Sequence, residues 1–508
     1  MESFGVNVEG QGDMLRAICL PFISPSHLIP GVEIGRIFAM HGVDVTIITT
    51  PANAAVFQSS IDRDSSRGRS IRTHVVKFPQ VAGLPEGREM VNADTPKDMA
   101  TKILEGLHIL AGQFQQLFRE MKPDFIVTDM FYPWSVDTAA ELGIPRLIYV
   151  GGTYLAHCAM DSLEQFAPHT KVDSDDESFL LPGLPHKLEM TRWQIPERFK
   201  VENHEFSEHM RKAKESEKRS YGSVFKSFYA LEGAYEDHYK ATTGTKSWSV
   251  GPISSWVNQD DADKAGRGLA NKQGQEKGNE GLLTWLDSKK EDSVVYVCFG
   301  SMNKFSSAQL VEIAHALEDS GHDFIWVVKK IDEGEDEGVR GFLEEFEKKV
   351  QASNRGYLIW GWAPQLLILE HPATGAVVTH CGMNTVIESV DAGLPMVTWP
   401  LFAEQFFNEK LLVDVLKIGV PVGVKKWVQW GVFGDEIVKR EDIVKAIALL
   451  MDSGAEYVEM KKRVKALSVA AKKAIEVGGS SYNNLKDLIE ELKSIKLQKD
   501  NRKVEAEA

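Results

Sequence analysis

Two polar residues stand where the ends of buried strands would bring them together. His27 follows the apolar run Leu15–Phe22 after a short stretch of Ser and Pro, and Asp129 ends the apolar run DFIVTD. The carboxyl ends of parallel strands meet at one edge of a sheet, so both side chains are expected there. A neutral imidazole can take a proton from a hydroxyl group, and a carboxylate on its other nitrogen orients the ring. The two are candidates for a general base and its partner acid, although an isolated loop histidine is more often structural.

A second stretch, Trp362 to Gln405, combines strands, a helix and polar residues at the joins. The run TGAVVTHCG has a β-branched apolar core and predicts a buried parallel strand. Asn384 and Thr385 then open a helix that ends at Gly393, and PMVTWP predicts the next strand. Because free N–H groups at a helix start attract anions, this stretch predicts a phosphate-binding site at the sheet edge.

The same stretch resembles the donor-binding box of the plant UDP-dependent glycosyltransferases. WAPQ, HCG-x-N and the closing EQ stand in the same order and register. The resemblance implies that Trp362 stacks on the uracil ring and that Gln365 and Glu388 hold the ribose hydroxyls. The other donor contacts that it implies are His380, Asn384 and Thr385 on the diphosphate, Glu404 and Gln405 on the sugar, and Ala363 and Gly382 within the box.

Four further positions bear on the implied site. His27 and Asp129 match the family's catalytic histidine and its partner acid. Ser301, in FGS after the run SVVYV, would add a hydroxyl to the phosphates, although an ordinary serine at a strand end would look the same. Met383 stands where the family has Trp. Because a thioether is apolar and adaptable, we expect the fold to survive, with looser packing around the sugar or diphosphate.

The elements that must position these residues alternate between strand and helix in both halves of the chain. This alternation predicts a doubly wound sheet in each half, and the resemblance implies the GT-B fold, two Rossmann-like domains facing across a cleft. The expected domains are an acceptor-binding domain at 1–250, a UDP-sugar-binding domain at 286–465, and C-terminal helices and tail at 466–508. Residues 251–285 are charged and Gly-rich and predict a mobile linker, and residues 1–13 are expected to be disordered.

Composition excludes several classes of protein. A chain of 508 residues is too long for one core, and its net charge of −15 argues against a nucleic-acid or membrane-surface binder. The four cysteines lack metal-ligand spacing and indicate reduced thiols in the cytoplasm. The polar N-terminus is no signal peptide, and no apolar run approaches the ~20 residues of a membrane span. We expect a cytoplasmic monomer with a UDP-sugar donor, a lipophilic small-molecule acceptor and no metal or other cofactor.

Asp173 and Asp175 form a DxD motif, with which another class of glycosyltransferase holds a metal-bound diphosphate. They lie in the charge run KVDSDDESF without a strong strand before it, and such a run is usually a solvated loop. We therefore predict a metal-independent reaction.

The function predicted is that of an inverting UDP-sugar glycosyltransferase. Phrases such as LPGLPHKLEMTRWQIP resemble the branch that acts on triterpenoid saponins, so the expected acceptor is a hydroxyl of a triterpenoid or its saponin. Gln405 favours UDP-glucose as the donor. Alternatives are UDP-galactose or UDP-glucuronate with a triterpenoid monoglucuronide, and a flavonoid or phenolic acceptor. Two different classes, a nucleotide-sugar epimerase and a non-catalytic UDP-sugar-binding protein, would not need the His27–Asp129 pair.

Overall fold

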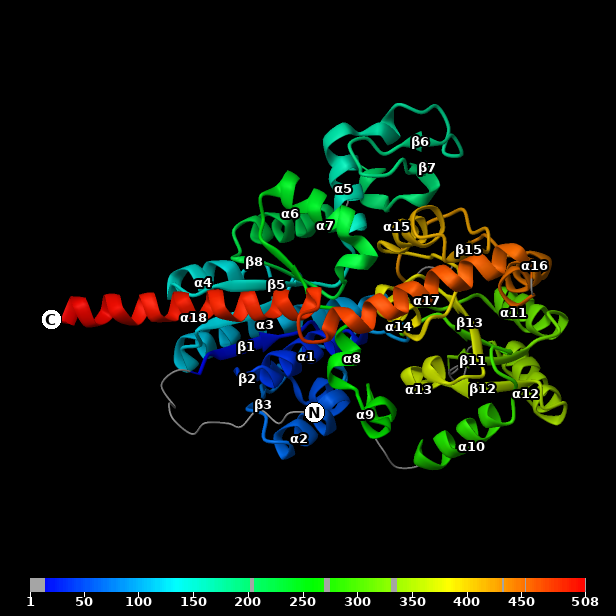
Figure 1. Cartoon of the computed structure of the whole chain (residues 1–508), viewed down its shortest axis with the longest axis horizontal. Helices are drawn as coiled ribbons and strands as arrows, with labels where there is room; N and C mark the ends of the chain where they lie inside the picture. The colour runs from blue at the N-terminus through cyan, green and yellow to red at the C-terminus, as the bar shows by residue number, and fades with distance from the viewer. Residues whose placement is uncertain are drawn as a thin grey trace.

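The computed structural model describes residues 14–201, 205–268, 275–329, 336–431, 434–452 and 454–507. It has two α/β domains, each built on a parallel sheet with helices on both faces (Figure 1). Residues 1–13, which we expected to be disordered, lie outside the described residues.

The N-terminal domain is built on a seven-stranded sheet in the order β3-β2-β1-β4-β5-β8-β9, and all its pairs are parallel. Every residue of β4 and β5 is buried, because parallel strands covered by helices on both faces meet no water. The strands are β1 (Arg16–Leu20), β2 (Asp44–Thr49), β3 (Ile71–Val75), β4 (Phe125–Asp129), β5 (Arg146–Val150), β8 (Gly222–Phe225) and β9 (Ser247–Ser249). The helices are α1 (Pro25–Met40), α2 (Pro51–Ser66), α3 (Lys97–Met121), α4 (Ser135–Leu142), α5 (Tyr154–Phe166), α6 (Glu205–Lys218) and α7 (Tyr229–Thr243).

Between α5 and α6 the chain forms a small excursion above the main sheet (Figure 1). It contains an antiparallel pair, β6 (Phe179–Leu180) and β7 (Glu189–Met190), and the short helical turns Pro168–Thr170, Arg192–Gln194 and Glu197–Phe199.

The C-terminal domain has a six-stranded sheet in the order β12-β11-β10-β13-β14-β15, also parallel throughout. Its strands are β10 (Val294–Cys298), β11 (Asp323–Val328), β12 (Gly356–Trp360), β13 (Thr374–Thr379), β14 (Met396–Thr398) and β15 (Gly419–Pro421). Its helices are α10 (Gln275–Asp287), α11 (Ser307–Asp319), α12 (Glu337–Ala352), α13 (Gln365–Glu370), α14 (Met383–Ala392), α15 (Gln405–Lys410), the π-helical turn Leu411–Val415, α16 (Arg440–Met451) and α17 (Ala455–Ile475).

Each sheet reverses its strand order at one point, and such a switch point opens a crevice at the carboxyl ends of the strands. In the N-terminal sheet it falls between β1 and β4, and in the C-terminal sheet between β10 and β13. The loops after β1, β10 and β13 lead to His27, Ser301 and His380, and Asp129 ends β4. Trp362 and Gln365 follow the neighbouring strand β12, and Glu404 and Gln405 follow β14.

The last helix, α18 (Ser480–Glu507), leaves the C-terminal domain and runs across the N-terminal one (Figure 1). Its apolar face joins the core cluster of β1, β2 and β4. The buried members of that face are Leu485, Leu488, Ile489 and Leu492. The Ser481 hydroxyl also donates to the Gly251 carbonyl at 2.6 Å, so the end of the chain completes the N-terminal domain.

The described part of the predicted linker differs from the expectation of mobile chain. It forms two short helices, α8 (Ile253–Val257) and α9 (Asp261–Gly266), and the larger part of α10, and Trp256 is buried in the N-terminal core. Asp263 accepts hydrogen bonds from Arg63 of α2 and from Arg67, which follows that helix, at 2.5 and 2.7 Å. The charged residues Asp260, Asp263, Lys264 and Arg267 of this stretch are thus held in ion pairs. Residues 269–274 lie outside the described part of the chain.

Candidate active site

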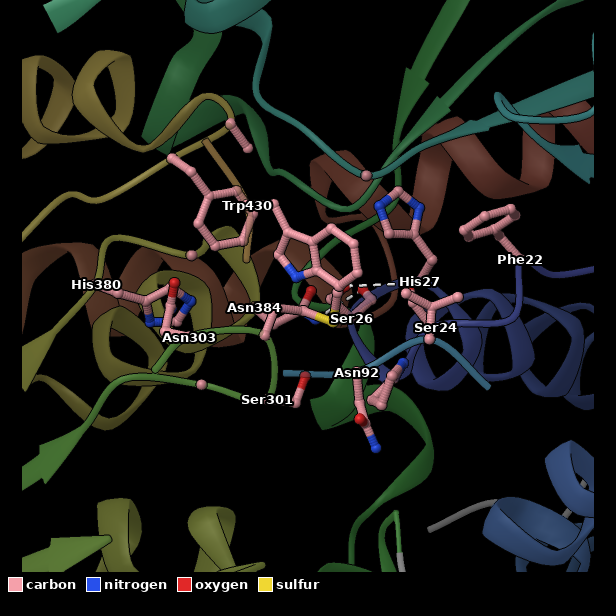
Figure 2. A pocket seen from close by; sticks show the side chains of 18 of the residues that line it. Phe22, Ser24, Ser26, His27, Asn92, Ser301, Asn303, His380, Asn384 and Trp430 are labelled. Atoms are coloured by element: carbon pink, nitrogen blue, oxygen red, sulfur yellow. Dashed lines mark hydrogen bonds between the residues drawn. The ribbon is translucent and has the colours of Figure 1, made fainter. Parts of the chain in front are cut away.

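A cavity of about 1920 Å³ lies between the two domains and is lined by both. Figure 2 shows His27 and Phe22 on one side, His380 and Asn303 on the other, and Asn384 between them. The carboxyl ends of β1 and β4 and those of β10 and β13 therefore open into the same space.

His27 and Asp129 meet as the sequence predicted. Nδ1 of His27 lies 2.8 Å from Oδ2 of Asp129, whose side chain is fully buried while the histidine is 19% exposed. Because a carboxylate only accepts hydrogen bonds, Nδ1 donates, and Nε2 is left as the free basic nitrogen. The Phe131 backbone N–H donates to Oδ1 of Asp129 at 3.0 Å and holds the carboxylate in place. The geometry is that of a hydroxyl-activating pair.

The local setting of His27 differs in one respect from the prediction of a loop. His27 lies in the first turn of α1, which begins at Pro25. Across from it the loop after β5 approaches so closely that a Cβ on Gly151 would lie 2.8 Å from Cε1 of the imidazole. The rings of Phe22 and Phe131 flank the imidazole at centroid distances of 6.0 and 5.2 Å. The base therefore has a fixed position at the edge of an apolar surface.

The helix start that the sequence predicted is present, but its polar residues have other roles than capping. α14 begins at Met383 after Gly382, and no side chain caps it. The Nδ2 group of Asn384 instead donates to the Ser26 carbonyl at 3.1 Å, and Oδ1 accepts from Lys226. The first N–H groups of α14 therefore have no side-chain cap. The Asn384 side chain instead joins this helix to Ser26 of the N-terminal domain, the residue before His27.

Trp362, Gln365, Thr385 and Glu388 lie together, as the order of the box implied. The Gln365 amide donates to Glu388 at 2.6 Å and to the Thr385 hydroxyl at 3.4 Å. The Trp362 indole N–H donates at 2.9 Å to the carbonyl of Arg267, a residue that sequence reasoning missed. Ala363 is buried beside them.

The guanidinium of Arg267 joins the two domains at this point. It pairs with Glu388 of α14 at 2.8 Å and with Glu33 of α1 at 2.6 Å. Burial raises the pKa of Glu388, an effect that the charge of Arg267 and the Gln365 hydrogen bond oppose. Burial would lower the pKa of Arg267, but Glu33 and Glu388 outweigh it and raise the pKa above its ordinary value. Arg267 therefore stays charged.

His380 and Ser301 lie on the loops after β13 and β10. Burial, with a smaller contribution from Lys329, lowers the pKa of His380 to about 4, so this imidazole is neutral at physiological pH. The loop after β10 needs glycine at Gly300, because φ there is +73° and a Cβ would lie 2.5 Å from Cε1 of His380. The Ser301 carbonyl accepts from Lys329 Nζ at 2.7 Å. His380 can thus offer a hydrogen bond to a phosphate but no charge.

Glu404 and Gln405 close the box at the start of α15. The Gln405 side-chain carbonyl accepts from the backbone N–H groups of Leu401 and Phe402 at 2.8 and 3.1 Å. The amide N–H₂ group is therefore the part that remains for a sugar hydroxyl. Glu404 is half-buried, and its Cγ lies 3.9 Å from where a Cβ on Gly152 would stand, so it reaches the facing loop of the N-terminal domain.

Lys226 was the other cation that sequence reasoning missed. It follows β8 directly, so its place after an apolar run at a sheet edge was the available signal. Burial lowers the pKa of Lys226 to about 8, against the opposing effect of Glu404 and Glu388.

Asp173 and Asp175 lie away from this site. Asp175 accepts from Arg192 at 2.7 Å, and neither aspartate lines the cavity. No cluster of three His, Cys, Asp or Glu side chains able to hold a metal ion is found in the part of the chain that the structure describes. No helix of that part is long and apolar enough to cross a membrane.

Two Rossmann-like domains that face each other across a cavity, with a His–Asp pair on one and an uncapped helix start on the other, define a GT-B glycosyltransferase. The family model described as UDP-glucoronosyl and UDP-glucosyl transferase matches residues 265–425. The chain is 63% identical over 487 residues to the soyasapogenol B glucuronide galactosyltransferase of Glycine max, covering 96% of this chain and 97% of that one. The chain therefore belongs to the UDP-glycosyltransferase family and is a UDP-sugar-dependent transferase.

Two further comparisons agree. The crystal structure of Glycyrrhiza uralensis UGT73P12 complexed with glycyrrhetinic acid 3-O-monoglucuronide superposes with a TM-score of 0.93 at 68% identity, covering 97% of this chain and 98% of that one. The anthocyanin 3'-O-beta-glucosyltransferase of Gentiana triflora is 42% identical over 485 residues, covering 95% of this chain and 99% of that one. The predictions of family, GT-B fold and enzyme class are confirmed.

Proposed function

We propose that the protein transfers a hexose from a UDP-sugar, with inversion, to a hydroxyl of a triterpenoid monoglucuronide. The observation that carries the proposal is the His27–Asp129 pair, which faces the uncapped start of α14 across one cavity. The acceptor class is supported by two relatives. The one at 63% identity is named for a triterpenoid glucuronide, and the structure at 68% identity is a complex with one. The N-terminal side of the cavity carries apolar side chains that suit such a ring system, and Phe22 and Phe131 flank His27. The apolar residues on that side also include Leu104, Met130, Met160 and Phe206.

In this proposal the donor lies along the C-terminal domain. Trp362 packs on the uracil, Gln365 and Glu388 hold the ribose, and His380, Asn384, Thr385 and Ser301 surround the diphosphate. Glu404 and the free amide N–H₂ of Gln405 bind the sugar hydroxyls. Nε2 of His27 takes the acceptor's proton as its oxygen attacks the anomeric carbon opposite UDP, which inverts that carbon. No metal takes part, and UDP-sugar is a co-substrate rather than a resident cofactor.

We propose UDP-glucose as the preferred donor because of Gln405. UDP-galactose is the second candidate, because the relative from Glycine max is a galactosyltransferase. The four cysteines are free and buried, which supports a reducing, cytoplasmic setting.

A product assay tests this function. Purified protein is incubated with UDP-glucose, UDP-galactose or UDP-glucuronate and with a triterpenoid, its 3-O-monoglucuronide or a flavonol, and products are identified by mass spectrometry. We expect a hexosylated monoglucuronide. Product on the flavonol alone, or release of UDP that does not depend on an acceptor, would contradict the proposal.

A further inference from the structure

Lys226 is a buried cation that has no ion pair among the described residues, although Glu404 and Glu388 favour its charged form from farther away. It is 3% exposed and lines the cavity between the domains. Its ammonium group donates to the side-chain carbonyl of Asn384, a neutral acceptor. Among the described residues no carboxylate lies within ion-pair distance of Lys226, whereas the other buried lysine, Lys461, is paired with Asp292 at 2.6 Å. A buried charge is costly unless it is paired. We therefore expect an anion to bind beside Lys226 in the cavity.

The position of Lys226 indicates which anion this is. Through Asn384 the ammonium group stands at the second residue of α14, where the free N–H groups and the helix dipole already favour negative charge. Another donor at this end of the site, His380, is neutral, so it adds no charge of its own. The one strongly anionic group that the reaction brings to a helix start is the diphosphate of the UDP-sugar.

We propose that Lys226 is a catalytic residue that reaches across from the N-terminal domain and binds the diphosphate oxygens of the donor. The inference rests on the proposed placement of the diphosphate at the start of α14. It adds a charge from the acceptor-binding domain to a donor site that the sequence placed wholly in the other domain.

The chemical step explains why a charge is needed there. The acceptor oxygen forms a bond to the anomeric carbon while its proton passes to Nε2 of His27. The bond between that carbon and the β-phosphate oxygen breaks, and its electron pair stays on UDP, which gains one negative charge. An ammonium group in contact with the diphosphate stabilises this charge more in the transition state than in the bound donor. Because Lys226 belongs to the N-terminal domain, the contact also requires the two domains to be closed on the donor.

Binding of UDP and of uridine separates this role from a structural one. Calorimetry on the full chain compares the unmodified protein with Lys226→Met, which keeps length and removes charge, and Lys226→Arg, which keeps charge. Lys461→Met is the matched control, because it removes a buried lysine outside the cavity. We expect Lys226→Met to weaken UDP about 10- to 100-fold and uridine less than about twofold, since a bond to a charged group is lost only for UDP. Lys226→Arg should recover most of the UDP affinity and of kcat, and Lys461→Met should leave the UDP-to-uridine ratio unchanged.

Three results would overturn the assignment. Equal weakening of UDP and uridine by Lys226→Met would mean that Lys226 only supports the fold. Unchanged UDP affinity with a selective loss of turnover on UDP-glucuronate would mean that the cation binds a sugar carboxylate. If the unmodified protein binds UDP no tighter than uridine, the proposed diphosphate site fails as well. Should Lys226→Met not fold, as judged by its thermal transition, Lys226→Gln takes its place with the same expectations.

Discussion

Replacement of His27 by Ala tests the mechanism most directly. The change removes Nε2, the nitrogen that remains once Nδ1 is bound to Asp129 at 2.8 Å. Loss of a general base typically costs ~10²–10⁴ in rate, which corresponds to about 3 to 5.5 kcal/mol of activation free energy. The nucleotide contacts proposed for Trp362, Gln365 and Glu388 belong to the other domain and are untouched. We therefore expect kcat to fall by that factor while the Kd for UDP stays within about twofold.

The same substitution has a second, separable effect on stability. Asp129 is fully buried and would keep only the Phe131 N–H as a partner. Leaving a buried carboxylate partly unsatisfied costs about 1–3 kcal/mol, so the melting temperature should fall as well. Asp129→Asn, which keeps the imidazole, should lose less activity than His27→Ala. The assay is UDP release at saturating donor with acceptor present, alongside calorimetry and thermal unfolding. Full activity in His27→Ala, or a loss of turnover matched by an equal loss of UDP affinity, would refute the reasoning.

Three other outcomes are expected. Activity should survive EDTA within about twofold, because helix-start N–H groups carry the diphosphate; loss restored by Mn²⁺ or Mg²⁺ would contradict this. Gln405→His should raise the ratio of UDP-galactose to UDP-glucose turnover while lowering both, since imidazole cannot replace the carbonyl that accepts from Leu401 and Phe402; an unchanged ratio in competition assays would contradict it. Met383→Trp should lower the unfolding free energy by about 1–3 kcal/mol, because Met383 is packed in the core; an unchanged denaturation midpoint would show that the core has room.

Much of the fold could be predicted, because buried parallel strands have continuous apolar runs as their sequences. DFIVTD and TGAVVTHCG became β4 and β13. The polar residues at their ends became Asp129, the buried partner of His27, and His380, which lines the cavity. The donor box was predictable because its residues lie close together in the chain.

The interdomain contacts could not be predicted, because they join distant residues that carry no local pattern. Arg267 looks like an ordinary surface cation in the sequence, and its partners Glu33 and Glu388 come from different domains. Lys226 could be placed at a sheet edge from the apolar run before it, but its contact with Asn384 of the other domain could not be predicted. The charged stretch before residue 268 looked like a linker for the same reason. Its partners, such as Arg63 and Glu33, lie some two hundred residues earlier. Asn384 was expected to cap its own helix, but the neighbouring domain supplies a better partner.

The return of α18 to the N-terminal domain has a consequence for how the protein is made. Leu485, Leu488, Ile489 and Leu492 belong to the same core cluster as β1, β2 and β4, yet Leu485 is translated 235 residues after residue 250, the expected end of that domain. At about 5–20 residues per second, the interval between the end of the N-terminal domain and these leucines is roughly 10–50 s. During that time an apolar surface of the nascent N-terminal domain lacks its cover and is open to chaperones. Ribosome stalling or a premature stop before residue 485 would thus damage the N-terminal domain, although that domain had been synthesised in full.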